Sequence, residues 1–231
     1  SSGQTGNSSA TVYLRPPVVG LHADRPQSFS MIAFVLLVLS TVTYDGFAET
    51  ALWQVVAQAF SEYFTPIAPL ISGIGMIFFA ILFIATYMAF IAVMALIVGQ
   101  KDKIHRLAGL FVFSIIPIAI AYHLSHYLSL LLTDGQLIIP RISDPFGFGW
   151  NLFGTAHYQT ELGLIGAATI WYTSIIAIIV GHIAAIYLAH TTALQEFEGN
   201  GKAILSQVPM VFLMIGYTMI SLWIIAQPIV A

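Results

Sequence analysis

The sequence contains no cysteine and very little charge. Without cysteine, disulfides, thiolate metal sites, iron–sulfur clusters and cysteine nucleophiles are all excluded, so a metal or haem needs His, Met or carboxylate ligands. Only 7% of the 231 residues are charged, whereas soluble domains carry about 25%. The net charge of −3 gives no indication of nucleic acid as a partner. With 58% hydrophobic residues, the composition is that of an integral membrane protein.

Several recognisable motifs are also absent. The sequence has no phosphate-binding P-loop, no dinucleotide fingerprint, no GxSxG and no HExxH. What it has instead is long apolar runs, and a membrane-spanning helix needs about 20 such residues. Five runs qualify, and the sequence therefore predicts an all-α bundle of about five transmembrane helices at 28–44, 69–98, 104–132, 162–189 and 203–226.

Two further features of this architecture follow from the sequence. Residues 45–64 are amphipathic and predict an interfacial helix after the first span, while residues 1–27 predict a polar arm ahead of the bundle at 28–231. Pro117 predicts a kink in the third span, because proline removes a backbone donor and clashes with the preceding turn.

The basic residues predict the orientation of the bundle. Lys and Arg are enriched in cytoplasmic loops. Placing the loop GQKDKIHR inside puts six basic residues there and only Arg141 outside. The six are Arg15, Arg25, Lys101, Lys103, Arg106 and Lys202. The N-terminal arm is then cytoplasmic and the C-terminus lies outside.

The predicted outer loop at 133–161 is long and rich in glycine, proline and aromatic residues. Loops of this length are usually functional or disordered, and the aromatic residues argue against disorder. We expect the loop to fold back as a lid over the outer mouth of the bundle. The alternative is an aromatic belt at the level of the lipid headgroups.

Ionisable residues near or within the apolar runs are the candidate functional residues, since such groups are costly in a membrane unless they are paired or bound. Asp45 and Glu49 are four residues apart at the end of the first span, and His123 and His126 are three apart in the third. A pair of imidazoles on one helical face can bind a metal, and His182 of the fourth span could join them.

The sequence thus predicts a metal site in the outer half of the bundle. Asp45, His123 and His126 are the expected ligands, Glu49 a ligand or general base, and His182 a ligand or its supporting partner. With no thiolate, the set suits zinc, copper or iron. His123 and His182 share one ion only if their depths match; a start of the fourth span at Leu162 would separate them by more than about ten ångströms. The alternatives to a metal site are that Glu49 is simply exposed to solvent and that His182 hydrogen-bonds a neighbouring helix.

The tyrosines, including Tyr87, Tyr122 and Tyr127, are most simply packing residues whose hydroxyl group makes a hydrogen bond.

Several blocks of the sequence together resemble a known family. They are MIAFVLLVLSTVTYDGFAETALW (31–53), YHLSHY (122–127), SDPFGFGWNLFGT (143–155), GHIAAIYLAH (181–190) and SQVPMVFLMIGYTMISLWIIAQ (206–227). This pattern resembles bacterial multi-pass membrane proteins labelled fenitrothion hydrolase-like, over about residues 12–231. The resemblance implies a location in the bacterial inner membrane, hydrolysis of an organophosphate triester, and further apolar segments upstream of this chain.

Three functions remain open at this point. The first is a metal-dependent hydrolase, or an oxidase if the metal is copper or iron. The second is a haem b electron-transfer subunit, in which histidines of separate helices serve as axial ligands. The third is a non-catalytic subunit of a larger membrane complex. The expected partners are the lipid bilayer and either the missing N-terminal part or other membrane subunits.

Overall fold

The computed structural model describes residues 19–21, 25–64, 70–160 and 166–227, and most of the predicted polar arm at 1–27 lies outside these residues. Within them the protein is an all-α membrane bundle without strands. Five helical stretches of the described chain are long and apolar enough to cross a membrane: 29–48, 71–98, 101–143, 168–196 and 200–225. The prediction of about five spans is therefore confirmed.

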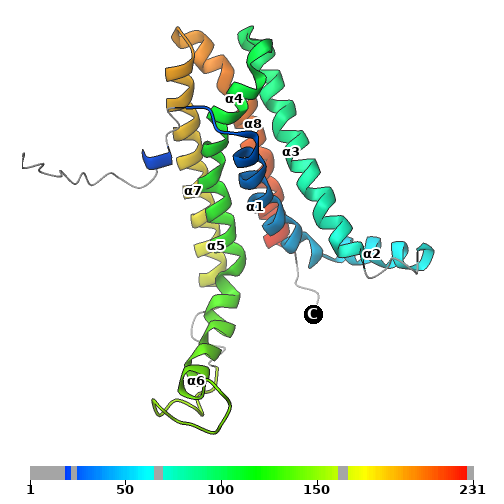
Figure 1. Cartoon of the computed structure of the whole chain (residues 1–231), viewed down its shortest axis with the longest axis vertical. Coiled ribbons are helices and arrows are strands. Elements are labelled where there is room, and N and C mark those ends of the chain that lie inside the picture. The colour runs from blue at the N-terminus through cyan, green and yellow to red at the C-terminus, as the bar shows by residue number, and fades with distance from the viewer. Residues whose placement is uncertain (1–18, 22–24, 65–69, 161–165, 228–231) are drawn as a thin grey trace, which may run out of the picture.

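The first span and the interfacial helix meet at a sharp turn. Helix α1 runs from Phe29 to Ala48, and its first turn is capped by the Ser28 side chain, which accepts from the Met31 N–H. The Thr50 side chain then accepts from Trp53 N–H and starts helix α2 (Ala51–Tyr63), none of whose residues is buried. Figure 1 shows α2 running across the axis of the other helices, as expected for an interfacial helix.

The third predicted span is interrupted where Pro117 predicted a kink. Helix α4 (Ile104–Phe111) tightens into the 3-10 segment η4 (Val112–Ile115), and α5 (Ile116–Thr133) begins with Pro117 in its first turn. Proline is tolerated there because the first turn of a helix needs no intrahelical donor. The segment continues past the predicted end through η5 (Asp134–Leu137) and the short helix α6 (Ile138–Ser143).

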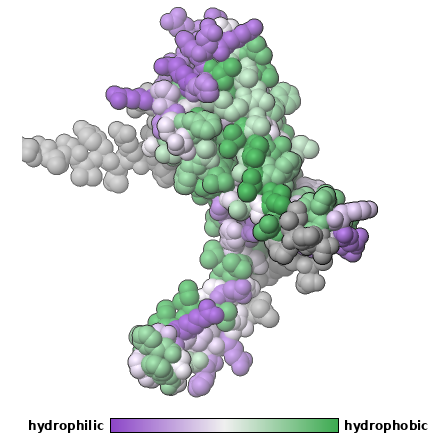
Figure 2. All heavy atoms as spheres, turned by 45° about the vertical axis from the view of Figure 1, so that its right-hand side comes forward, coloured by the Kyte–Doolittle hydropathy of each residue, from purple (hydrophilic) through white to green (hydrophobic). Residues whose placement is uncertain are grey.

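The remaining helices complete the bundle. They are α3 (Ile71–Val98), α7 (Ala167–Glu196) and α8 (Asn200–Ile225). Residues 161–165 are outside the described chain, so the predicted start of the fourth span at Leu162 lies there too. Figure 2 shows hydrophilic residues gathered at the end of the bundle opposite α2 and hydrophobic residues along its middle. We call the two ends the α2 end and the α4 end.

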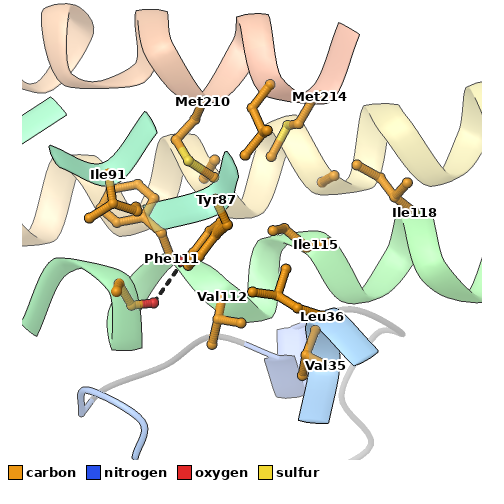
Figure 3. Packing of buried hydrophobic residues seen from close by; sticks show 14 of the residues in the cluster. Val35, Leu36, Tyr87, Ile91, Phe111, Val112, Ile115, Ile118, Met210 and Met214 are labelled. Carbon is orange, nitrogen blue, oxygen red and sulfur yellow. Dashed lines mark hydrogen bonds between the residues drawn. The ribbon is translucent and has the colours of Figure 1, made fainter. Parts of the chain in front are cut away.

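The core is built from buried residues of α1, α3, α4, η4, α5, α7 and α8. Figure 3 shows side chains from several helices interlocking there, with Tyr87 fully buried among them. The Tyr87 hydroxyl donates a 2.7 Å hydrogen bond to the Ala108 carbonyl. A buried hydroxyl in an apolar core needs such a partner, so this bond links α3 to α4. Tyr87 is thus a packing residue whose hydroxyl group is hydrogen-bonded, as the sequence predicts for it.

Helix α5 packs closely on α7, and glycine makes this possible. A Cβ built on Gly181 would lie 2.5 Å from Ala121 Cβ and 2.8 Å from the Pro117 carbonyl oxygen. About two turns nearer the α2 end, the buried Ser125 and Ser174 hydroxyls each donate to the other residue's carbonyl oxygen, at 3.0 and 3.3 Å. The serine pair fixes α5 against α7 at the level of the candidate site, and the approach at Gly181 does so further along the bundle.

The loop after α6 is held by its own side chains. The Asp144 carboxylate accepts from the Phe148 and Gly149 N–H groups at 2.9 and 2.8 Å, and Asn151 accepts from the Ala156 N–H. Figure 1 shows α6 and this loop extending beyond the end of α5, away from the bundle. The expected lid over the mouth is therefore not the arrangement that the structure has; η5 and α6 lengthen α5 into a stalk that carries the loop outward.

Candidate functional site

A cavity lies at the α2 end of the bundle, among α1, α5, α7 and α8, and we call it the polar cavity because most of its lining residues have polar side chains. Its volume is about 540 Å³, within the range of ligand pockets. The polar residues of its wall come from α1, α5 and α7 and from the segments that follow α1 and α8, namely Asp45, Glu49, Thr50, Ser125, His126, Tyr127, Ser129, Thr133, Trp171, Ser174 and Gln227.

Asp45 and His126 form the centre of this wall. His126 Nε2 lies 3.0 Å from Asp45 Oδ2, and the Tyr127 hydroxyl donates to the same oxygen at 2.8 Å. The Asp45 side chain is about half exposed, whereas that of His126 is only 19% exposed. Since a carboxylate oxygen can only accept, the Nε2 of His126 carries the proton in this contact. The pair is therefore oriented and accessible from the cavity.

Glu49 lies on the same wall, four residues beyond Asp45. It is the C-terminal cap of α1, and its exposed side chain lines the cavity. Although Gly46 lies between the two carboxylates, α1 continues through it to Ala48. The two acidic residues therefore belong to one helical end, as their spacing predicts.

Gly46 lets α1 lie close to both α8 and α5. A Cβ at this position would lie 2.7 Å from Ile224 Cγ2, and 3.3 Å from both His126 Cε1 and the Tyr122 hydroxyl oxygen. That hydroxyl is buried without a hydrogen-bond partner. Glycine thus leaves room beside α1 for the Ile224 side chain, the His126 ring and the Tyr122 hydroxyl.

His123 does not join this group, although it is three residues from His126. Its Nδ1 donates to the Ala119 carbonyl of its own helix at 2.9 Å. Its ring lines a different cavity, an apolar groove between α1 and α5. The expected pair of imidazoles on one metal is therefore not formed in this structure.

His182 does not join it either. It is 91% buried, its Nδ1 donates to the Ile178 carbonyl at 2.7 Å, and its Nε2 has no hydrogen-bond partner. Ser174 lies level with Ser125. His182 is eight residues further along α7, or about 12 Å. His123 lies two residues from Ser125 toward the same end of the bundle as His182, so the depths of His123 and His182 differ by about 9 Å, between the two separations considered from the sequence.

The described residues contain no group of three or more His, Asp or Glu side chains close enough to hold a metal ion. Nor do two histidines of different helices share either of the two cavities just named. The structure thus brings Asp45 and His126 together, with Glu49 on the same wall, and leaves His123 and His182 elsewhere.

The sequence did not single out Tyr127, Gly46 or the Ser125–Ser174 pair as parts of the site. The one available signal was that Tyr127 adjoins His126 in the block YHLSHY. The role of the other residues depends on which helix faces them, which their own spacing does not reveal.

Comparison with protein-family models, curated proteins and solved structures finds no match for this chain.

Proposed function

We propose that the polar cavity is the working site of a membrane enzyme and holds one divalent transition metal ion between Asp45 and His126. The observation that carries this proposal is the 3.0 Å separation of His126 Nε2 and Asp45 Oδ2 on the wall of an accessible cavity. An imidazole nitrogen and a carboxylate oxygen suit zinc, copper or iron. Metal–ligand bonds of about 2.0–2.2 Å let two atoms this far apart reach a common ion.

The residues fit such an ion in part. Asp45 and His126 supply two ligands, and Glu49 on the same helical end supplies a third or acts as a base. Binding would displace the proton that His126 and Asp45 share, so it is coupled to release of that proton. The Tyr127 hydroxyl would hold Asp45 in place by donating to its Oδ2. This set is smaller than the sequence predicts, because it omits His123 and His182.

The reaction that this site favours is hydrolysis. A bound ion makes a coordinated water a better nucleophile at neutral pH. Glu49 would accept the proton from water while the hydroxyl group adds to the electrophilic atom of the substrate. The bond between that atom and the leaving group would then break, and the proton would pass from Glu49 to the leaving group. The resemblance to fenitrothion hydrolase-like proteins agrees with this reaction class, and membership in that family stays a prediction.

A second candidate is a metal-independent hydrolase. It is favoured by the double use of Asp45 Oδ2, which accepts from both Tyr127 and His126. A carboxylate that holds the Nε2 proton orients the ring and leaves Nδ1 as a general base, as in other His–Asp pairs. Haem b receives less support, since each of the two cavities has one histidine in its wall.

Metal analysis of the purified protein tests the proposal. Wild type should contain zinc, copper or iron in stoichiometric amounts, and Asp45→Asn and His126→Ala should lose it. His123→Ala and His182→Ala are the matched controls and should retain it, because neither ring reaches the cavity wall. Equal loss of metal in all four variants would support the larger ligand set predicted from the sequence and would contradict a site made by Asp45 and His126.

The other functions give different results in the same preparations. Wild type without metal but with activity that depends on His126 would select the metal-independent base. A Soret absorption band lost in His123→Ala or His182→Ala would select haem b. Neither signal, together with stable co-purifying membrane proteins, would select the non-catalytic subunit.

A further inference from the structure

A second cavity lies along the membrane-embedded part of α1 and α5. It is a groove of about 510 Å³. Its wall comes from Phe34, Val35 and Val38 of α1 and from Ile116, Ala119, Ile120, His123, Leu124, Tyr127 and Leu131 of α5. All of these side chains except His123 and Tyr127 are wholly apolar. Phe34, Ile120, Leu124 and Leu131 are 49–61% exposed, so the groove opens to the surroundings of the bundle.

Tyr127 belongs to the walls of both the groove and the polar cavity. Its ring lies in the groove wall, while its hydroxyl donates to Asp45 Oδ2 in the cavity wall. Along α5 the groove lining starts at Ile116 and continues past the level of His126 to Leu131. The apolar groove therefore passes beside the carboxylate and imidazole of the candidate site, which it meets at Tyr127.

We infer that the groove binds the apolar chain of a membrane-partitioned amphiphile and delivers its polar end, past Tyr127, to Asp45 and His126. This inference rests on the proposed function and names its substrate class: a molecule with an apolar chain whose polar end carries the bond to be hydrolysed. Burial of the chain supplies affinity roughly in proportion to its apolar area. The polar end reaches the hydrogen-bonding groups of the cavity wall. The apolar chain therefore contacts apolar side chains and the polar end contacts polar ones.

The composition of the groove favours an amphiphile over a further transmembrane helix. Helix–helix interfaces in membranes are enriched in Gly, Ala, Ser and Thr, which let two backbones approach closely. Of the ten lining residues only Ala119 is of this kind, and Phe34, Ile116, Ile120, Leu124 and Leu131 are large. A flexible chain fits between such side chains without a close approach of backbones.

Photolabelling of the full chain in phosphatidylcholine nanodiscs tests the inference. The probes are two forms of hexadecanol, one with a diazirine near the chain end and one with the diazirine beside the hydroxyl. The chain-end probe should label residues 34–38 and 116–120, and the hydroxyl-end probe should label Asp45 and Tyr127. Mass spectrometry of the digested protein locates each adduct.

A double variant that fills the groove supplies the decisive comparison. Ile120→Trp with Leu124→Trp introduces two large rings at exposed wall positions four residues apart, and labelling at both ends of the groove should be lost. Ile77→Trp with Ile81→Trp makes the same change at exposed positions of α3 and should leave the labelling unchanged. Folding of both variants is checked by their thermal unfolding.

Labelling spread evenly over the exposed faces of α3, α7 and α8, or labelling unaffected by the filled groove, would overturn the inference and leave only ordinary contact with lipid. A groove closed to the probe by a co-purifying helix would overturn it as well. Metal content measured on the same samples separates the two proposals. Groove labelling without metal would remove the metal site alone, and metal without groove labelling would remove the amphiphile alone.

Discussion

The Tyr127 hydroxyl donates a 2.8 Å hydrogen bond to Asp45 Oδ2, joining two residues 82 positions apart in the chain. The same carboxylate oxygen lies 3.0 Å from His126 Nε2. Two adjacent side chains of α5 thus hold one carboxylate of α1. This contact determines where Asp45 points, and it lies where the polar cavity and the apolar groove share Tyr127 in their walls.

We expect Tyr127→Phe to weaken the site without abolishing it. The change removes one donor to Asp45 and keeps the ring, and a typical hydrogen bond contributes about 1 kcal/mol to stability. Metal affinity should fall by about fivefold, the factor that corresponds to that free energy. Isothermal titration measures the affinity. Tyr172→Phe, at an exposed tyrosine of α7, is the control, and an equal effect there would contradict a specific role for Tyr127.

Gly46→Ala should disrupt the packing of α1 on α8 and α5 at the site. The new Cβ would lie 2.7 Å from Ile224 Cγ2 of α8 and 3.3 Å from His126 Cε1 of α5, so Ile224 must shift and His126 must give way slightly. Overpacking of this kind typically costs about 1–3 kcal/mol. The measurements are the midpoint of thermal unfolding and metal content, and both should fall. Gly73→Ala is the control because its Cβ would meet nothing within 4 Å. Unchanged metal content in Gly46→Ala would show that the space at Gly46 is not needed to form the site.

Gly181→Ala should destabilise the bundle more than Gly46→Ala does. Its Cβ would meet the Pro117 carbonyl oxygen at 2.8 Å and Ala121 Cβ at 2.5 Å, and neither atom can move without the backbone. We expect a loss near the upper end of the overpacking range, about 3 kcal/mol. Gly216→Ala meets open space and should be neutral or stabilising by up to about 1 kcal/mol. Chemical unfolding in detergent compares the two variants; similar stability would argue against a tight α5–α7 approach.

Asp144→Ala should open the loop beyond α6 and leave the bundle intact. The carboxylate accepts from the Phe148 and Gly149 N–H groups, and alanine cannot replace it. Hydrogen exchange and proteolysis should both increase over residues 144–156, with an unchanged unfolding midpoint of the bundle. Asp144→Asn keeps one side-chain acceptor and should show a smaller effect. Loss of metal in either variant would show that the loop acts on the distant cavity after all.

The sequence by itself determined the architecture. Backbone groups in lipid must bond within their own helix, so a long apolar run predicts a span. That rule located the helices now seen at 29–48, 71–98 and 200–225, each close to its predicted bounds. Pro117 likewise marked the break ahead of α5, since it lacks a backbone donor and its ring clashes with the preceding turn.

Only the tertiary structure decided which polar residues meet. The spacing of His123 and His126 places their rings roughly 60° apart around the axis of α5. It says nothing about which helix packs against each ring. Asp45 of α1 lies against His126, while His123 folds onto its own backbone in the groove. His182 lies about 12 Å along the bundle from Ser174, the α7 residue that is level with Ser125 of the cavity wall. The close packing of Gly181 on α5 fixes this register of the two helices. The spacing of residues in the sequence shows which of them share a face of one helix, whereas a site forms only where the faces of several helices pack together.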